Sequence, residues 1–154
     1  MRVVIQRVSR ADAALSAAPE EPISSINRGA VVLAAFQPKD TRINSEQMIK
    51  KIKDLRIFSD LDGKLNLSSA EVGAEFLLVS QFTLYAETKY GNRPSFSQAA
   101  PKPQAEEAFD FFVATAKRMI GESQIKSTPF GSDLQLSLTN DGPITLWLDS
   151  DLIL

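Results

Sequence analysis

Three polar side chains interrupt an otherwise apolar segment, and their types could support catalysis. The segment runs from Glu75 to Tyr85, and its apolar pattern is broken by Ser80, Gln81 and Thr83. A polar group buried in a strand must find a hydrogen-bond partner or serve a purpose. Hydroxyl and amide groups are able to orient a substrate or to stabilise charge that develops during a reaction. The simpler interpretation is a strand that leaves the core, with Ser80 and Thr83 bonded to neighbouring backbone.

The sequence contains no histidine and no cysteine, which limits the catalytic machinery. Their absence removes Ser-His and Cys-His nucleophilic catalysis, and it removes the usual nitrogen and sulfur ligands of zinc. The acidic residues form neither an EF-hand nor a paired-aspartate pattern, so we expect no metal and no cofactor. Any catalysis must therefore use hydroxyls, amides, backbone groups, carboxylates or part of the substrate itself.

A second segment of interest is Asn140-Asp-Gly-Pro-Ile-Thr145. Its composition is typical of a tight turn, which is the simplest interpretation. The alternative is that Gly142 and Pro143 hold their backbone carbonyls in an unusual direction, where the carbonyls serve function. A cis bond before proline is not the default, because only about 5–6% of such bonds in folded proteins are cis.

These two segments and their neighbours resemble the family of D-aminoacyl-tRNA deacylases, also called D-tyrosyl-tRNA deacylases. The resemblance extends over nearly the whole chain, and so many blocks in this order are highly specific. Residues 10–28 depart from it, because alanine, proline and glutamate replace the valines and glycine turn of the family's short hairpin. The matching blocks are Met1-Arg-Val-Val-Ile-Gln-Arg-Val8, Leu55-Arg-Ile-Phe58, Val79-Ser-Gln-Phe-Thr-Leu-Tyr-Ala86, Gly91-Asn-Arg-Pro-Ser-Phe96, Phe130-Gly131 and Asn140-Asp-Gly-Pro143.

The resemblance implies a homodimeric enzyme that hydrolyses the ester between a D-amino acid and the 3′-terminal adenosine of tRNA, as chiral proofreading in translation. Each site would combine residues 80–83 of one subunit with Gly142 and Pro143 of the other, whose peptide bond the family holds cis. The carbonyls of Gly142 and Pro143 would accept hydrogen bonds from the substrate's α-ammonium group. An L-side chain would then clash with the Gly142 carbonyl, whereas a D-side chain would point to solvent and glycyl-tRNA would also be accepted.

The resemblance makes Ser80, Gln81, Phe82 and Thr83 the candidate catalytic residues. The N–H groups of Gln81 and Phe82, with the Ser80 hydroxyl, would stabilise the oxyanion, assisted by the adenosine 2′-hydroxyl. Thr83 is either a covalent nucleophile or a positioning residue, and positioning is favoured because a nucleophilic hydroxyl needs a base and none flanks the motif. Phe82 either stacks on the terminal adenine or packs in the core. Arg7 either hydrogen-bonds at the Gly-Pro carbonyls or their surroundings, or forms a surface salt bridge.

Two other functions are alternatives. One is a relative that clears L-residues from mischarged tRNA; such proteins differ at the Ser-Gln-Phe-Thr segment and have a trans Gly-Pro bond, and the intact residues 80–83 disfavour it. The other belongs to a different class, a non-catalytic module that binds tRNA ends or another protein through its dimer surface.

The elements that must position these segments are strands and helices in mixed order. Apolar runs predict strands over 2–9, 30–36, 75–85, 124–128, 133–139 and 144–148. Helical spacing predicts helices over 43–56 and from Pro103 to Ile120, the second capped by Gly121. We expect a loop or irregular hairpin over 10–28, a polar loop over 87–101, and turns at 60–63 and 140–143. This order predicts an α+β fold, and the resemblance implies mixed and antiparallel sheets that form a barrel-like core with two main helices.

The length of 154 residues and the 44% of hydrophobic residues predict one domain, residues 1–154. No run approaches the roughly 20 apolar residues of a membrane helix, and the first eight residues are unlike a signal peptide, so we expect a cytoplasmic protein that does not contact membranes. The net charge of −2 does not indicate a nucleic-acid partner, although a few well-placed cations suffice for phosphate contact. Two local basic groups are Lys50, Lys51, Lys53 and Arg56, which also fit a solvated helix face, and Lys89, Arg93 and Lys102.

Overall fold

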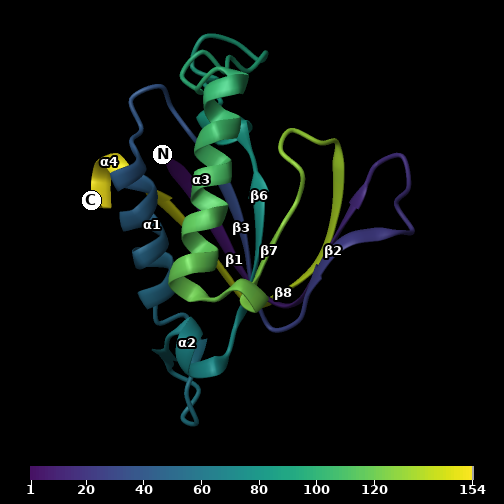
Figure 1. Ribbon diagram of the computed structural model, residues 1–154, viewed down its shortest axis with the longest axis vertical. Helices are drawn as coiled ribbons and strands as arrows, with labels where there is room; N and C mark the ends of the chain where they lie inside the picture. Colours follow the sequence, from purple (N-terminus) through teal and green to yellow (C-terminus); the bar gives the residue numbers. More distant parts are fainter. Residues whose placement is uncertain (154) are drawn as a thin grey trace.

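One six-stranded sheet organises the computed structural model, which describes residues 1–153 (Figure 1). The strand order is β2-β1-β3-β6-β7, and β8 pairs with the other edge of β1 from Arg2 to Leu15, with two register shifts. Strand β1 is antiparallel to its neighbours, whereas β3, β6 and β7 are parallel. The strands are β1 (Arg2–Leu15), β2 (Pro22–Ile26), β3 (Gly29–Ala35), β6 (Glu75–Ser80), β7 (Ile125–Ser127) and β8 (Leu134–Asp149), and a separate pair joins β4 (Phe58–Ser59) to β5 (Leu65–Leu67).

Two long helices, α1 (Arg42–Asp54) and α3 (Lys102–Ile120), cover one face of the sheet (Figure 1). The start of α1 is fixed by Thr41, whose side chain accepts a hydrogen bond from the Asn44 N–H, while Asn44 caps Thr41 in return. Helix α3 has Pro103 in its first turn, and Gly121, at φ 143°, ends it. Four short helical segments are α2 (Ser69–Val72), α4 (Ser150–Ile153), η1 (Phe82–Tyr85) and η2 (Glu122–Gln124). Among residues 1–153, no helix combines the length and the apolar character needed to cross a membrane.

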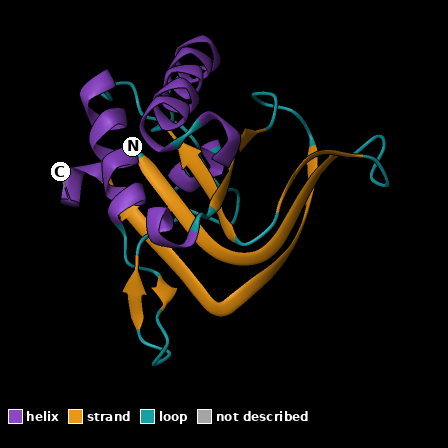
Figure 2. Cartoon of the chain, turned by 60° about the horizontal axis from the view of Figure 1, so that its bottom comes forward, coloured by secondary structure: helices purple, strands orange, loops and turns teal. Residues whose placement is uncertain are grey.

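The sheet buries hydrophobic side chains on both of its faces. The larger core lies between the sheet and the helices and includes Phe76, Phe109 and Phe112. The smaller core lies on the opposite face and includes Val31 and Leu77. Figure 2 shows that the long strands are sharply bent. The bend coincides with register shifts between β1 and β8 at residues 6–10, because an irregular ladder increases local bending. The predicted barrel-like α+β core is confirmed.

Two parallel strands approach so closely at one position that only glycine fits there. Strand β3 begins at Gly29, opposite Glu75 at the start of β6. A Cβ atom on Gly29 would lie 1.8 Å from the Glu75 carbonyl oxygen, which no side chain tolerates. The parallel pairing that aligns the end of β6 with β3 therefore depends on a residue without a side chain.

The structure corrects four predicted boundaries. The strand predicted over 2–9 continues to Leu15 and pairs with β2 through a register shift at Ala13 and Ala14, so the irregular-hairpin alternative for residues 10–28 is confirmed and the loop alternative is wrong. The strand predicted over 75–85 ends at Ser80, where η1 follows after Gln81. The two strands predicted over 133–139 and 144–148 are one bent strand, β8, because pairing with β1 continues on both sides of residues 140–143. Helix α1 ends at Asp54, and Leu55 is its extended C-cap.

Candidate active site

The segment Ser80–Thr83 lies where β6 leaves the sheet. Ser80 is the last residue paired with β3, opposite Ala34, and the Gln81 N–H donates to the Ala34 carbonyl at 2.8 Å. Gln81 has φ −146° and ψ 74°, which turns the chain into η1. The prediction that the Gln81 N–H stabilises an oxyanion is therefore wrong for this conformation, because that donor is already bonded. The Phe82 N–H has no acceptor among residues 1–153 and is free to serve that role.

The hydroxyl groups of this segment have defined partners. The Ser80 hydroxyl accepts a hydrogen bond from the Gly131 N–H at 3.2 Å, and this bond ties the end of β6 to the Phe130-Gly131 turn. The Gln81 side-chain amide donates to the Thr83 hydroxyl at 2.6 Å. Within the described part of the chain, neither a carboxylate nor a lysine is hydrogen-bonded to Thr83, so no base activates it.

Phe82 lies on the surface of the chain and is not a core residue. Its side chain is 56% exposed, so the core-packing interpretation is wrong. Its ring packs edge-on against Phe96, with 4.9 Å between ring centroids and 74° between planes. Edge-to-face pairs orient aromatic rings, and the exposure of Phe82 leaves its ring accessible to a ligand.

A cleft of about 660 Å³ opens beside this aromatic pair. That volume suits a small ligand or one nucleoside with its ester. A second hollow of about 630 Å³ lies between α3 and the β1–β2 hairpin, but no predicted site residue lines it. The side chains and backbone around the first cleft include Phe36, Ser80, Gln81, Phe82, Phe96 and Phe130.

The bend of β8 at residues 140–143, here called the turn, is held from inside by a buried arginine. Arg7 donates from Nε to the Asp141 carbonyl at 3.0 Å and from one terminal nitrogen to the Ile57 carbonyl at 2.7 Å. Its Nε also lies 3.2 Å from the Asp141 carboxylate, and the Arg7 side chain is only 8% exposed. The predicted surface salt bridge therefore does not describe Arg7 fully, because the side chain is buried and also bonds to backbone. Near the turn, the backbone acceptor of its hydrogen bond is the Asp141 carbonyl and not that of Gly142 or Pro143. The Gly142–Pro143 peptide bond is cis, and both residues are exposed.

Strand register shows that the two candidate segments do not meet within one chain. Arg7 pairs with Ala30, and Ala30 pairs with Phe76, so the turn lies level with the start of β6. Ser80 lies four residues further along β6, which is about 13 Å at the rise of a strand. Strands β1 and β3 also lie between β8 and β6. A site that uses both segments therefore needs a second chain.

Charged side chains lie near the segment: Lys102 and Asp133 line the cleft, and Arg2 donates a hydrogen bond to the Leu84 carbonyl at 3.0 Å. Tyr85 ends η1, and burial raises the pKa of its hydroxyl well above the usual value, with Asp40 and Asp149 adding to the effect. The Arg2 guanidinium lies 4.5 Å from the centre of the Tyr85 ring. Among residues 1–153, no three acidic side chains gather as a metal site.

Sequence reasoning did not single out three residues that the structure places at the cleft. Phe96, Phe130 and Lys102 line it from the loop after η1, the turn before β8 and the start of α3. Phe96 and Phe130 occur in blocks that match the family, and Lys102 was noted only for its charge. For the two phenylalanines, the available signal was an aromatic residue next to glycine, proline or serine in the sequence, outside the predicted helices and strands.

The fold and the cleft define a small α+β hydrolase whose site consists of hydroxyl, amide, backbone and aromatic groups. Residues 4–149 match the family model described as D-Tyr-tRNA(Tyr) deacylase, and the chain belongs to this family. It is 44% identical to D-aminoacyl-tRNA deacylases of Pseudomonas fluorescens strain Pf0-1 and Chlorobaculum parvum, over 97% of this chain and 100% and 98% of theirs. A solved structure of c-Myc DNA Unwinding Element Binding Protein superposes with a TM-score of 0.90 at 38% identity, covering 97% of this chain and 98% of that one.

Proposed function

We propose that this protein hydrolyses the ester bond of D-aminoacyl-tRNA in the cytoplasm and releases the free D-amino acid and tRNA. The observation that supports the proposal is the aromatic cleft of nucleoside size at the end of β6, which is lined by Phe82, whose N–H has no acceptor among residues 1–153. Family membership over residues 4–149 supports the same reaction.

The chemistry rests on charge stabilisation by the backbone. The Phe82 N–H faces the developing oxyanion of the ester, and one preorganised donor of this kind contributes about 10²–10³-fold to a rate. The Ser80 hydroxyl, held by the Gly131 N–H, supplies a second donor. Phe82 stacks on the terminal adenine, and Thr83 positions the nucleoside. The 2′-hydroxyl of the substrate assists the attack on an ester that is already activated.

The partner that completes the site is a second copy of this chain. On the sheet face opposite α1 and α3, Trp147, Val4 and Leu33 form one row across β8, β1 and β3. Trp147 is 52% exposed, and the other two are half-buried. This row lies between the level of the turn and the level of Ser80. A two-fold axis through it would therefore bring the turn of one chain toward residues 80–83 of its partner.

Chirality follows from the carbonyls of the partner's turn. Gly142 and Pro143 are exposed, and their carbonyl oxygens accept the α-ammonium group of the substrate without a charged side chain. Once the ammonium and the ester are fixed, an L-side chain points into the Gly142 carbonyl and a D-side chain points to solvent. Glycine has no side chain to reject, so glycyl-tRNA is also a substrate.

The direct test is deacylation of matched D-, L- and glycyl-tRNA, with and without a metal chelator. We expect hydrolysis of the D- and glycyl-esters, little hydrolysis of the L-ester, and no effect of the chelator. Rapid hydrolysis of the L-ester would refute the chirality argument, and loss of activity with chelator would refute a metal-free site. Tight tRNA binding without turnover would instead favour the non-catalytic module.

The shared site is tested with two inactive variants that carry their lesions on opposite segments. Phe82→Ala removes the aromatic wall, and Gly142→Ala alters the turn, where a Cβ would lie 3.0 Å from an Arg7 nitrogen. After unfolding and refolding together, half of the dimers are mixed and each has one intact site, so about a quarter of wild-type activity should return. No recovery from folded, mixed dimers would place the whole site in one chain.

A further inference from the structure

A loop of seven residues rises directly from the rim of the cleft. Its base is closed by Glu87 and Ser95, whose N–H and carbonyl groups bond reciprocally at 2.8 and 2.9 Å. The chain enters the loop shortly after η1 and returns at Phe96, which packs on Phe82 in the cleft wall. Figure 1 shows this segment above the start of α3. Any strand of nucleic acid that leaves the cleft on this side passes residues 88–94, here called the rim loop.

The rim loop presents an exposed aromatic ring with cations around it. Tyr90 is 82% exposed, and the Lys89 Nζ lies 5.1 Å from the centre of its ring. Arg93 is exposed on the same loop, and Lys102 lines the cleft below it. Within residues 1–153, none of these three cations forms a salt bridge. The loop therefore offers both a stacking surface and positive charge to a ligand.

An exposed aromatic side chain beside unpaired cations suits single-stranded nucleic acid, because bases stack on the ring and phosphates contact the cations. We infer that the rim loop is a second binding site, for the unpaired nucleotides that precede the terminal adenosine of tRNA. Tyr90 stacks on one of these bases, and Lys89 and Arg93 contact the phosphates. The inference rests on the proposed function for the identity of the nucleic acid.

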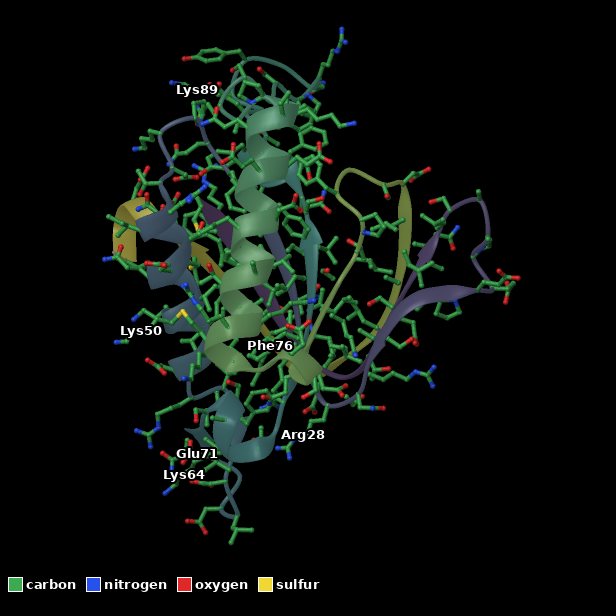
Figure 3. The ribbon with its side chains drawn as sticks, in the orientation of Figure 1. Arg28, Lys50, Lys64, Glu71, Phe76 and Lys89 are labelled. Carbon is green, nitrogen blue, oxygen red and sulfur yellow. The ribbon has the colours of Figure 1, made fainter. Side chains whose placement is uncertain are left out.

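The other basic group of the chain does not serve this role. Lys50, Lys51 and Lys53 lie on α1, and Lys50 is 4.0 Å from the carboxylate of Asp54. Figure 3 shows Lys50 beside the middle of the molecule and Lys89 at the end where the rim loop lies. None of the α1 lysines lines the cleft. The rim loop is therefore the basic surface through which the acceptor end of tRNA approaches.

The test compares D-aminoacyl-tRNA with the D-aminoacyl ester of adenosine, which lacks the preceding nucleotides. Tyr90→Ala should lower kcat/KM for the tRNA about fivefold or more, the effect of one lost stacking contact, and leave the adenosine ester unchanged. Leu61→Ala, a fully exposed apolar residue in the 60–63 turn, is the matched control and should change neither rate. Equal losses on both substrates, or no loss on either, would overturn the inference.

A binding measurement separates this inference from the proposed function. The ligand is an oligonucleotide with the sequence of the tRNA 3′ end that carries no amino acid, so its binding is measured without any hydrolysis. Tyr90→Ala should weaken this binding about fivefold or more. The double variant Lys89→Ala/Arg93→Ala should reduce the slope of log affinity against log salt by about 1.4, since two phosphate contacts are lost. Unchanged affinity and slope would refute the rim loop as a binding site even if the enzyme hydrolyses its substrate. Failure of hydrolysis with these effects intact would refute only the proposed function.

Discussion

Replacement of Arg7 is the sharpest test of how the sheet supports the turn at residues 140–143. Arg7→Met keeps most of the apolar stem and removes the guanidinium. The variant loses the bonds to the carbonyls of Ile57 and Asp141, at 2.7 and 3.0 Å, and the contact with the Asp141 carboxylate. The turn should then shift, because these bonds fix it to β1 and to the segment before β4.

The size of the effect follows from the number of lost bonds. A hydrogen bond from a charged donor contributes about 1.5–3 kcal/mol, and two such bonds are lost. Removal of a buried, desolvated charge offsets part of that cost. We therefore expect the free energy of unfolding to fall by about 3 kcal/mol, a large share of the roughly 5–15 kcal/mol that stabilises a typical domain.

Urea unfolding followed by circular dichroism measures the stability. The rate of D-aminoacyl-tRNA hydrolysis, at urea concentrations below the unfolding transition, shows whether a shifted turn impairs the reaction. The matched control is Arg10→Met on the same strand, because the Arg10 side chain is 70% exposed and, within residues 1–153, forms a salt bridge with Asp12 alone. Exposed pairs of this kind contribute little, so the control should unfold and react like wild type. Equal stability of the two variants would refute the argument, whereas a destabilised Arg7→Met variant with a normal rate would leave Arg7 a structural role alone.

Three further perturbations have definite outcomes. Gly29→Ala should lower the free energy of unfolding by about 3 kcal/mol or more, because its Cβ would meet the Glu75 carbonyl; an unchanged melting temperature would contradict this. Tyr85 ionises only above the usual range in the folded state, so its contribution to stability is present below about pH 10 and is lost as the pH rises further. Tyr85→Phe also removes a buried hydroxyl that has no hydrogen-bond partner among residues 1–153, so it should be at least as stable as wild type at neutral pH and lose less stability in alkaline urea titrations. Thr83→Val should retain at least about a tenth of the wild-type rate if Thr83 only positions the nucleoside, and a loss beyond about 10⁴-fold would support the nucleophile.

Local patterns in the sequence were sufficient for the two long helices. Apolar spacing placed α1 and α3 within a few residues, because an amphipathic helix repeats its buried positions along the chain. The apolar run over residues 2–9 correctly predicted the first part of β1. The absence of histidine and cysteine limited the chemistry without any knowledge of the fold. Spacing did not predict α2 and α4, because a four-residue helix has no repeat to detect.

Other features depended on contacts between distant segments. The sequence predicts either a loop or an irregular hairpin over residues 10–28 because their composition is weakly β-forming, and pairing of residues 10–15 with β2 and β8 on both sides decides for the hairpin. The segment Phe82–Tyr85 reads as a strand, yet it lacks a β partner beyond Ala34 and forms a 3₁₀ turn. The acceptors of Arg7 are equally invisible in the sequence, since Ile57 and Asp141 lie 50 and 134 residues away.

The sequence by itself determined the fold class, the chemical groups available to the site and, through its resemblance, the family. Only the tertiary structure decided which of those groups are free to act. The Gln81 N–H is occupied by the sheet, Phe82 faces outward at a cleft, and the turn at Gly142 and Pro143 lies too far along the sheet to reach them. The physical reason is that the sequence fixes which hydrogen-bond donors and acceptors each residue carries. Strand register fixes which of these groups are already bonded within the sheet.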